Sequence, residues 1–145
     1  MRTMMFAAAL AALVPLPAGA THWHATAGNA RLVTYVDQDS LQAGGGKVTG
    51  DTLTIYREPV DQAIVGVKVH TEFACDDHYF RTIEFSYYDA AQKLLSTEPS
   101  DAPDERRTSD PGSISGVVMA FACSTGAGDS VDDPYADAKA RFAAM

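Results

Sequence analysis

The most regular alternation of hydrophobic and polar positions lies between residues 64 and 88, and it predicts two antiparallel strands joined by a tight bend at residues 75–78. Along the first strand, residues suited to burial recur at every second position from Val65 to Cys75. This period of two is typical of a strand with one buried face. The bend is acidic, as expected where Asp side chains bond to nearby backbone groups.

The second strand of this hairpin repeats the pattern less strictly. We expect Tyr79, Ile83, Phe85 and Tyr87 on its buried face, where Arg81 is the one interrupting charge. An arginine in that position must meet a carboxylate or extend its charged end to the rim of the sheet. The other face of the hairpin is polar, and its side chains are those of Lys68, His70, Glu72, Thr82 and Glu84.

Shorter runs of alternating, β-branched or aromatic residues predict four more strands, over residues 21–25, 31–37, 47–57 and 93–97. Pro59 should end the third of these, because proline has no N–H to donate to a β ladder. The three glycines before that strand indicate a loop. They do not fit a phosphate-binding loop, since the position that requires the first glycine is Leu41. Residues 98–110 lack hydrophobic periodicity and predict an exposed loop.

Hydrophobic residues from Ile114 to Ala122 follow the spacing of an amphipathic helix, with Asp110 available as its N-cap and Pro111 in its first turn. The β-branched pair in this segment leaves a buried strand over residues 117–123 as the alternative. The sequence therefore predicts an α+β fold. Its antiparallel sheet has about five to six strands, and a C-terminal helix packs on one face.

A second helical pattern begins at Pro134, after a glycine-rich linker over residues 125–130. Tyr135, Ala138 and Phe142 share one stripe of this helix. With about a dozen residues it is too short to be stable alone in water, so it must dock on another surface to persist.

Residues 1–20 have the composition of a secretory signal, with a hydrophobic run after Arg2 and the small residues Ala18 and Ala20 at a cleavage site. No cysteine lies near that site to carry a lipid anchor, and no later segment is long and apolar enough to span a membrane. We expect an exported protein, periplasmic, at the cell surface or secreted. The remaining 125 residues suffice for one domain.

The chain is acidic, with a formal net charge of −8, and its basic residues are mostly scattered. This distribution argues against nucleic acid as a partner. Cys75 and Cys123 are the only cysteines, and in an exported protein they predict a disulfide between the hairpin bend and the end of the helical segment. A reactive redox pair is the alternative, but the spacing is not Cys-x-x-Cys.

No constellation of residues indicates a catalytic, metal or cofactor site. Of the four histidines, only His22 and His24 are close in sequence, whereas His70 and His78 lie apart, so we expect no metal site. There is no Gly-x-Ser-x-Gly nucleophile motif. We therefore predict no catalytic residues and no cofactor, and the sequence does not identify binding residues.

Several short motifs follow one another in a recognisable order. They are Trp23, residues 35–37 with 40–41, residues 72–75 with 79–81, and residues 111–113 leading to Cys123. This order resembles that of the surface-adhesin protein E-like family. The resemblance implies an antiparallel sheet tied to a C-terminal helix by a disulfide, in an exported protein of Gram-negative bacteria. Named adhesins of the family bind host matrix and serum proteins, including laminin, vitronectin and plasminogen.

The chain departs from this family at three places. Residues 105–107 replace a tryptophan often found before the Pro-Gly-Ser motif, the lipid-anchor cysteine is absent, and the helix from Pro134 to Met145 is an addition. We accordingly divide the chain into a signal peptide (1–20), a surface-adhesin protein E-like domain (21–124), and a linker with a C-terminal helix (125–145). The predicted function is non-enzymatic binding of a host extracellular protein or an envelope protein. The alternative is a periplasmic enzyme or small-ligand-binding protein whose site assembles in space.

Overall fold

The computed structural model describes residues 21–145, so the predicted signal peptide lies outside the described residues. The described part is an eight-stranded antiparallel sheet with two α-helices and one short 3₁₀ helix. The strands are β1 (Trp23–Gly28), β2 (Leu32–Asp37), β3 (Gln42–Gly44), β4 (Lys47–Val60), β5 (Ile64–Ala74), β6 (Tyr79–Tyr88), β7 (Leu94–Pro99) and β8 (Asp129–Val131). The helices are η1 (Gln38–Ser40), α1 (Ile114–Ala122) and α2 (Pro134–Ala144).

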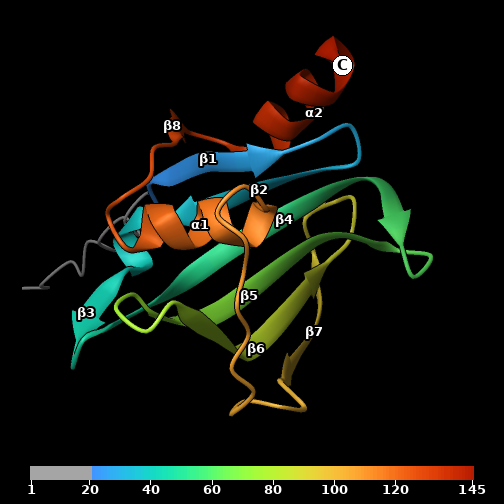
Figure 1. The fold of residues 1–145 in the computed structure, drawn as a ribbon. Helices are drawn as coiled ribbons and strands as arrows, with labels where there is room; N and C mark the ends of the chain where they lie inside the picture. The colour runs from blue at the N-terminus through green and yellow to red at the C-terminus, as the bar shows by residue number, and fades with distance from the viewer. Residues whose placement is uncertain (1–20) are drawn as a thin grey trace, which may run out of the picture.

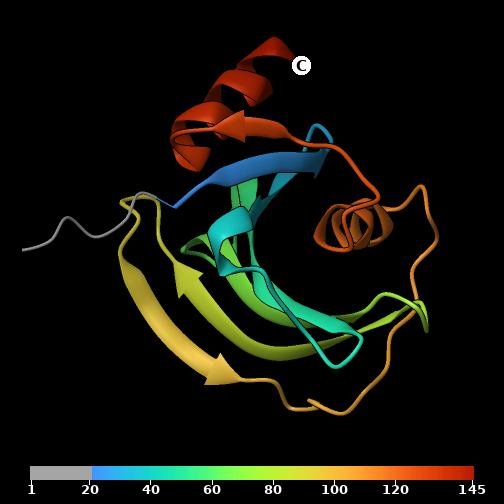
Figure 2. The same cartoon turned by 90° about the vertical axis from the view of Figure 1, so that its left-hand side faces the viewer.

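The strands follow the order β7-β6-β5-β4-β2-β1-β8, and β3 pairs with β4 beside this path (Figure 1). The sheet is strongly curved. Figure 2 shows it bending around α1, which lies on the inner face, while α2 lies outside the curve beyond β1. The sheet therefore has an inner face covered by α1 and an outer face that α2 covers in part.

The predicted α+β fold is confirmed, but the sheet has more strands than expected. β3 and β8 have three residues each, too few to show a period of two in the sequence. β8 forms within and just beyond the predicted linker, where it pairs with β1. β4 also continues past Pro59 to Val60. The β4–β5 register is irregular between Ile55 and Val60, so the ladder does not need the missing N–H there.

The central hairpin forms as predicted from β5 and β6, but the faces of β6 were assigned wrongly in part. The register shifts between the pairs His70–Glu84 and Thr71–Thr82, which leaves Ile83 as an extra residue on β6. This β-bulge reverses the alternation. Thr82 consequently opposes Thr71 on the inner face, whereas Arg81 opposes Glu72 on the outer, polar face.

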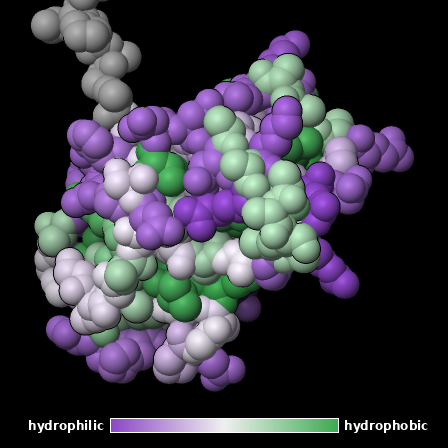
Figure 3. Space-filling view, turned by 90° about the horizontal axis from the view of Figure 1, so that it is seen from above, coloured by the Kyte–Doolittle hydropathy of each residue, from purple (hydrophilic) through white to green (hydrophobic). Residues whose placement is uncertain are grey.

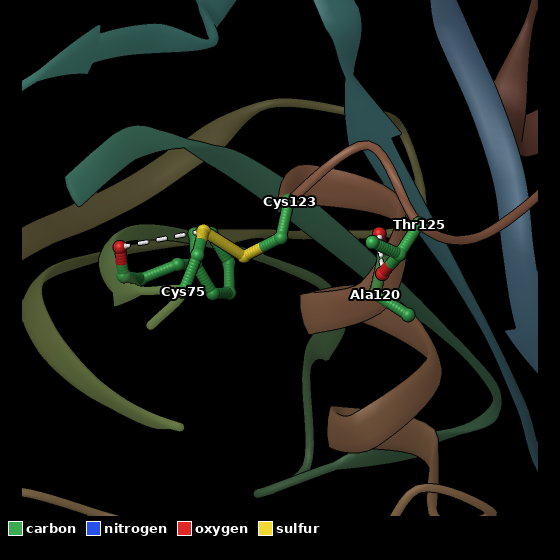
Figure 4. The surroundings of a disulfide bond; sticks show 5 residues. Cys75, Ala120, Cys123 and Thr125 are labelled. Carbon is green, nitrogen blue, oxygen red and sulfur yellow. Dashed lines mark hydrogen bonds between the residues drawn. A yellow bond between two sulfur atoms is a disulfide. The ribbon is translucent and has the colours of Figure 1, made fainter. Parts of the chain in front are cut away.

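Helix α1 packs on the inner face, which rules out the alternative of a buried strand. Its N-cap is Ser113 and not Asp110, because the Ser113 side chain accepts the Gly116 N–H. At its other end the disulfide between Cys75 and Cys123 joins the helix to the hairpin bend, as predicted (Figure 4). The buried residues on this side are Val36, Phe73, Val118, Met119 and Ala122.

Helix α2 forms as predicted and docks on the outer face. Asp133 caps its first turn by accepting the backbone N–H groups of Tyr135 and Ala136. A second core lies beneath it, formed by Ala25, Val33, Tyr35, Leu53, Ile55, Ala138 and Phe142. The fully buried Tyr35 donates its hydroxyl to Asp137 at 2.8 Å, which links the middle of the sheet to the helix.

Candidate functional site

The outer face of the sheet is divided between a covered and an open half. Helix α2 lies over β2, over Leu53 and Ile55 of β4, and over Gly66 at the start of β5. Among residues 21–145, no helix lies over the charged outward side chains that follow toward the hairpin bend on β4, β5 and β6. We call this second part the open face, and it consists of Lys47, Asp51, Lys68, His70, Glu72, Arg81 and Glu84. Four of the five polar residues that the sequence assigned to this face lie here. Thr82 is the exception, because the bulge turns it inward.

Glu72 is the centre of one ion-pair cluster on the open face. Its Oε1 atom accepts from Lys47 Nζ at 3.0 Å and from Arg81 at 2.6 Å. Arg81 also reaches Asp104 at 3.2 Å. Burial acts to raise the pKa of the Glu72 carboxyl, but the hydrogen bonds from Lys47 and Arg81 outweigh it and hold the pKa below its usual value. The arginine therefore meets a carboxylate, the first of the two outcomes that the sequence allowed.

Asp51 is the centre of a second cluster. Its carboxylate contacts His70 Nδ1 at 2.7 Å and Lys68 Nζ at 3.7 Å. These side chains come from the neighbouring strands β4 and β5, and Asp51 lies directly opposite His70 in the register. Most charges of the open face are thus held in fixed positions by partners of opposite sign.

A groove runs along α2 and meets the open face at Lys68. It consists of two hollows of about 450 and 610 Å³ that share Gln92, Asp133 and Tyr135. We call them together the α2 groove. The first hollow also contains the aromatic residues Trp23 and Tyr88. Figure 3 shows the molecule from the α2 side, with hydrophilic surface interrupted by smaller hydrophobic areas.

Tyr135 lies between the two hollows and depends on a glycine of β5. A side chain at Gly66 would collide with the Tyr135 hydroxyl, so only glycine leaves room for the ring to lie close to the sheet. Burial, together with nearby Tyr88, Asp89 and Asp133, raises the pKa of Tyr135 to about 12. The phenol is therefore a neutral donor and acceptor at physiological pH.

Sequence reasoning did not find the α2 groove. Trp23 begins β1, Tyr88 ends β6 and Tyr135 lies in the first turn of α2, so only the fold brings them together. The one signal in the sequence was that Tyr135 shares a stripe of its helix with Ala138 and Phe142. This pattern predicted that the helix packs on another surface, and did not predict a groove.

The histidines lie in separate environments. His22 contacts Asp39 at 2.9 Å, His24 packs on Phe121 with 5.1 Å between the ring centroids, and His78 is exposed at the hairpin bend. Within residues 21–145, no three His, Cys, Asp or Glu side chains are grouped in a way that suits a metal ion. Neither of the two α-helices in this range has the length and hydrophobicity needed to cross a membrane.

Comparison with known proteins identifies a matching family. The family described as surface-adhesin protein E matches residues 23–124, which extend from the start of β1 to just past the disulfide. No curated protein and no solved structure is significantly similar to the chain. The matched segment contains β1 to β7 and α1, whereas β8 and α2 follow it.

Proposed function

Because the chain belongs to the surface-adhesin protein E family, we propose that it is an exported, non-enzymatic protein-binding domain. We further propose that a protein partner docks in the α2 groove and extends onto the open face. The partner is a host extracellular protein or a protein of the bacterial envelope. We expect that surface to place basic side chains against exposed Asp132 and Asp133 and acidic ones against Lys68, Arg57 and Lys139. The net charge of −8 favours a partner that is basic overall.

The observation that carries this proposal is the side-by-side position of aromatic and charged groups. Tyrosine and tryptophan are enriched among the residues that dominate binding energy, and they lie most often in a pocket surrounded by polar residues. Trp23, Tyr88 and Tyr135 line such a hollow, and the ordered ion pairs of the open face begin beside it at Lys68. Fixed side chains lose little freedom on binding, which favours affinity.

The first experiment changes the charge of the groove. Asp132→Lys should weaken binding because it places a cation opposite the basic partner, and Asp132 is exposed and does not cap α2. Asp77→Lys is the matched control, since it makes the same charge change at the hairpin bend, at the far end of β5 and β6. Binding is measured by surface capture from host matrix and envelope extracts, followed by affinity measurement with the purified partner.

The second variant removes an aromatic ring from the groove. Tyr88→Ala should lower the affinity for the partner by at least tenfold, about 1.4 kcal/mol. Circular dichroism should show that both groove variants remain folded. Equal loss of binding in Asp132→Lys and Asp77→Lys would place the contact elsewhere. A hydrolase screen tests the alternative. If the protein turned over a substrate in that screen, and a single substitution in a pocket abolished the turnover, the enzymatic alternative would replace this proposal.

Export is a separate part of the proposal. The exported chain should begin at Thr21, after cleavage behind Ala20. N-terminal sequencing of the protein recovered from the periplasm or medium checks this, and a chain that still begins at Met1 would contradict it.

A further inference from the structure

The inner face of the sheet contains a cavity of about 210 Å³ beneath α1. Its floor is formed by five threonines from four neighbouring strands, namely Thr34, Thr52, Thr54, Thr71 and Thr82. Its walls are mostly apolar, and Ser115 and Arg107 are the polar residues among them. Phe73, Phe80 and Phe85 close the side of β5 and β6, and Ile114 and Val118 of α1 form the roof.

Three of these threonines are buried without a described partner for the hydroxyl group. Thr34 and Thr54 bond to each other at 3.1 Å. Thr52, Thr71 and Thr82 are only 7, 5 and 7% exposed, and within residues 21–145 their hydroxyls make no hydrogen bond to another side chain or to the backbone. Their oxygen atoms are not among the fully enclosed polar atoms that lack a partner in residues 21–145, so these hydroxyls open onto the cavity. They are therefore available to bond to a molecule that enters it.

We infer that this cavity binds a small uncharged molecule with a single ring and two or three hydroxyl, carbonyl or amide groups on one edge. Threonine hydroxyls both donate and accept, so the floor complements such an edge. The apolar walls complement the ring. Arg107 is the only ionisable residue of the lining, and its guanidinium group bonds to Glu105 at 2.8 Å. No free charge is thus left to favour an ion.

The size of the cavity agrees with one ring. An apolar protein cavity of about 150 Å³ accommodates benzene, so 210 Å³ leaves space for polar substituents. The roof is also fixed in place, because the Cys75–Cys123 disulfide holds the end of α1 to the hairpin bend. This site lies on the opposite face of the sheet from the α2 groove. Its inference does not depend on the proposed function, and either can fail alone.

The test uses three ring compounds as probes. Resorcinol carries two hydroxyls, toluene has the ring alone, and benzoate adds a charge. In NMR titrations of the purified protein, resorcinol should shift the methyl signals of Thr71, Thr82 and Val118. It should bind at least tenfold more tightly than toluene or benzoate.

The threonine variants test the role of the floor. Thr71→Val should weaken resorcinol binding by at least tenfold, because it removes a hydroxyl from the floor of the cavity. Thr49→Val is the control, because Thr49 lies on the same strand as Thr52 but opposes Glu72 on the outer face. It should leave resorcinol binding unchanged.

Three results would overturn the inference. They are the absence of methyl shifts with resorcinol, equal affinity for toluene, and a Thr71→Val variant that binds resorcinol as well as the original protein. A Thr71→Val variant that unfolds would be replaced by Thr82→Val, which removes a hydroxyl from the neighbouring strand.

Discussion

Breaking the disulfide should remove a large part of the stability of the domain. The Cys75–Cys123 bond closes a loop with a sequence separation of 48 residues. In the chain-entropy model, such a cross-link stabilises the folded state by about 4 kcal/mol, because it restricts the unfolded chain. Since domains of this size have a total stability on the order of 5–15 kcal/mol, the loss of this bond should be plainly measurable.

Urea unfolding of the oxidised and reduced protein measures this quantity. Far-UV circular dichroism follows the whole sheet and both helices, while the fluorescence of Trp23, the single tryptophan, follows the core under α2. The reduced protein should lose about 4 kcal/mol of unfolding free energy by both signals. The double variant Cys75→Ala and Cys123→Ala should lose slightly more, because both half-buried sulfur atoms pack against the α1 core.

A small effect would refute the reasoning. A decrease below about 1 kcal/mol would mean that the unfolded chain gains little freedom, so that the loop entropy is not the source of stability. If circular dichroism changed on reduction while the Trp23 signal stayed at its folded value, α1 would have detached alone. The two halves of the protein would then unfold separately and not in one step.

Two further changes have predictable outcomes. Gly116→Ala should destabilise the fold by about 1–3 kcal/mol in urea unfolding, although alanine favours a helix, because a Cβ there would collide with the Asp110 carbonyl oxygen. Stabilisation by this change would contradict the close approach of Asp110. Burial and the hydrogen bond to Asp137 raise the pKa of Tyr35, so the folded state keeps the phenol neutral while the unfolded state ionises above pH 10. The original protein should therefore lose stability more steeply above pH 10 than Tyr35→Phe, and parallel curves would contradict this.

The long elements could be predicted from the sequence because each one combines a clear period with a local signal. Strand β5 has an uninterrupted period of two, and α2 has a proline in its first turn after a capping Asp133. The predicted bond between the two cysteines then placed the end of α1 at the hairpin bend. The periods and capping signals depend on residues that are close in sequence, so the sequence alone shows them.

The missed features depend on neighbours in space. The one sign of the bulge at Ile83 was Arg81, a charge on the face assigned to the core, and the extra residue moves Arg81 outward and Thr82 inward. The α2 groove and the threonine cavity are assembled from strands that are adjacent only after folding. The period of two shows which residues share a face of the sheet, but not which elements pack against that face. The sequence therefore predicted neither the α2 groove nor the threonine cavity.

The family match ends between α1 and α2, which pack on opposite faces of the sheet. Residues 23–124 contain the part of the inner face that α1 covers, together with α1, the disulfide and the threonine cavity. The α2 helix lies beyond this segment, and it covers Tyr35, Leu53 and Ile55, which would otherwise expose hydrophobic surface on the outer face. A domain that ended after residue 124 would need another cover for these side chains. Because α2 supplies that cover and also forms one wall of the groove, this chain couples the stability of its outer face to the site proposed for its partner.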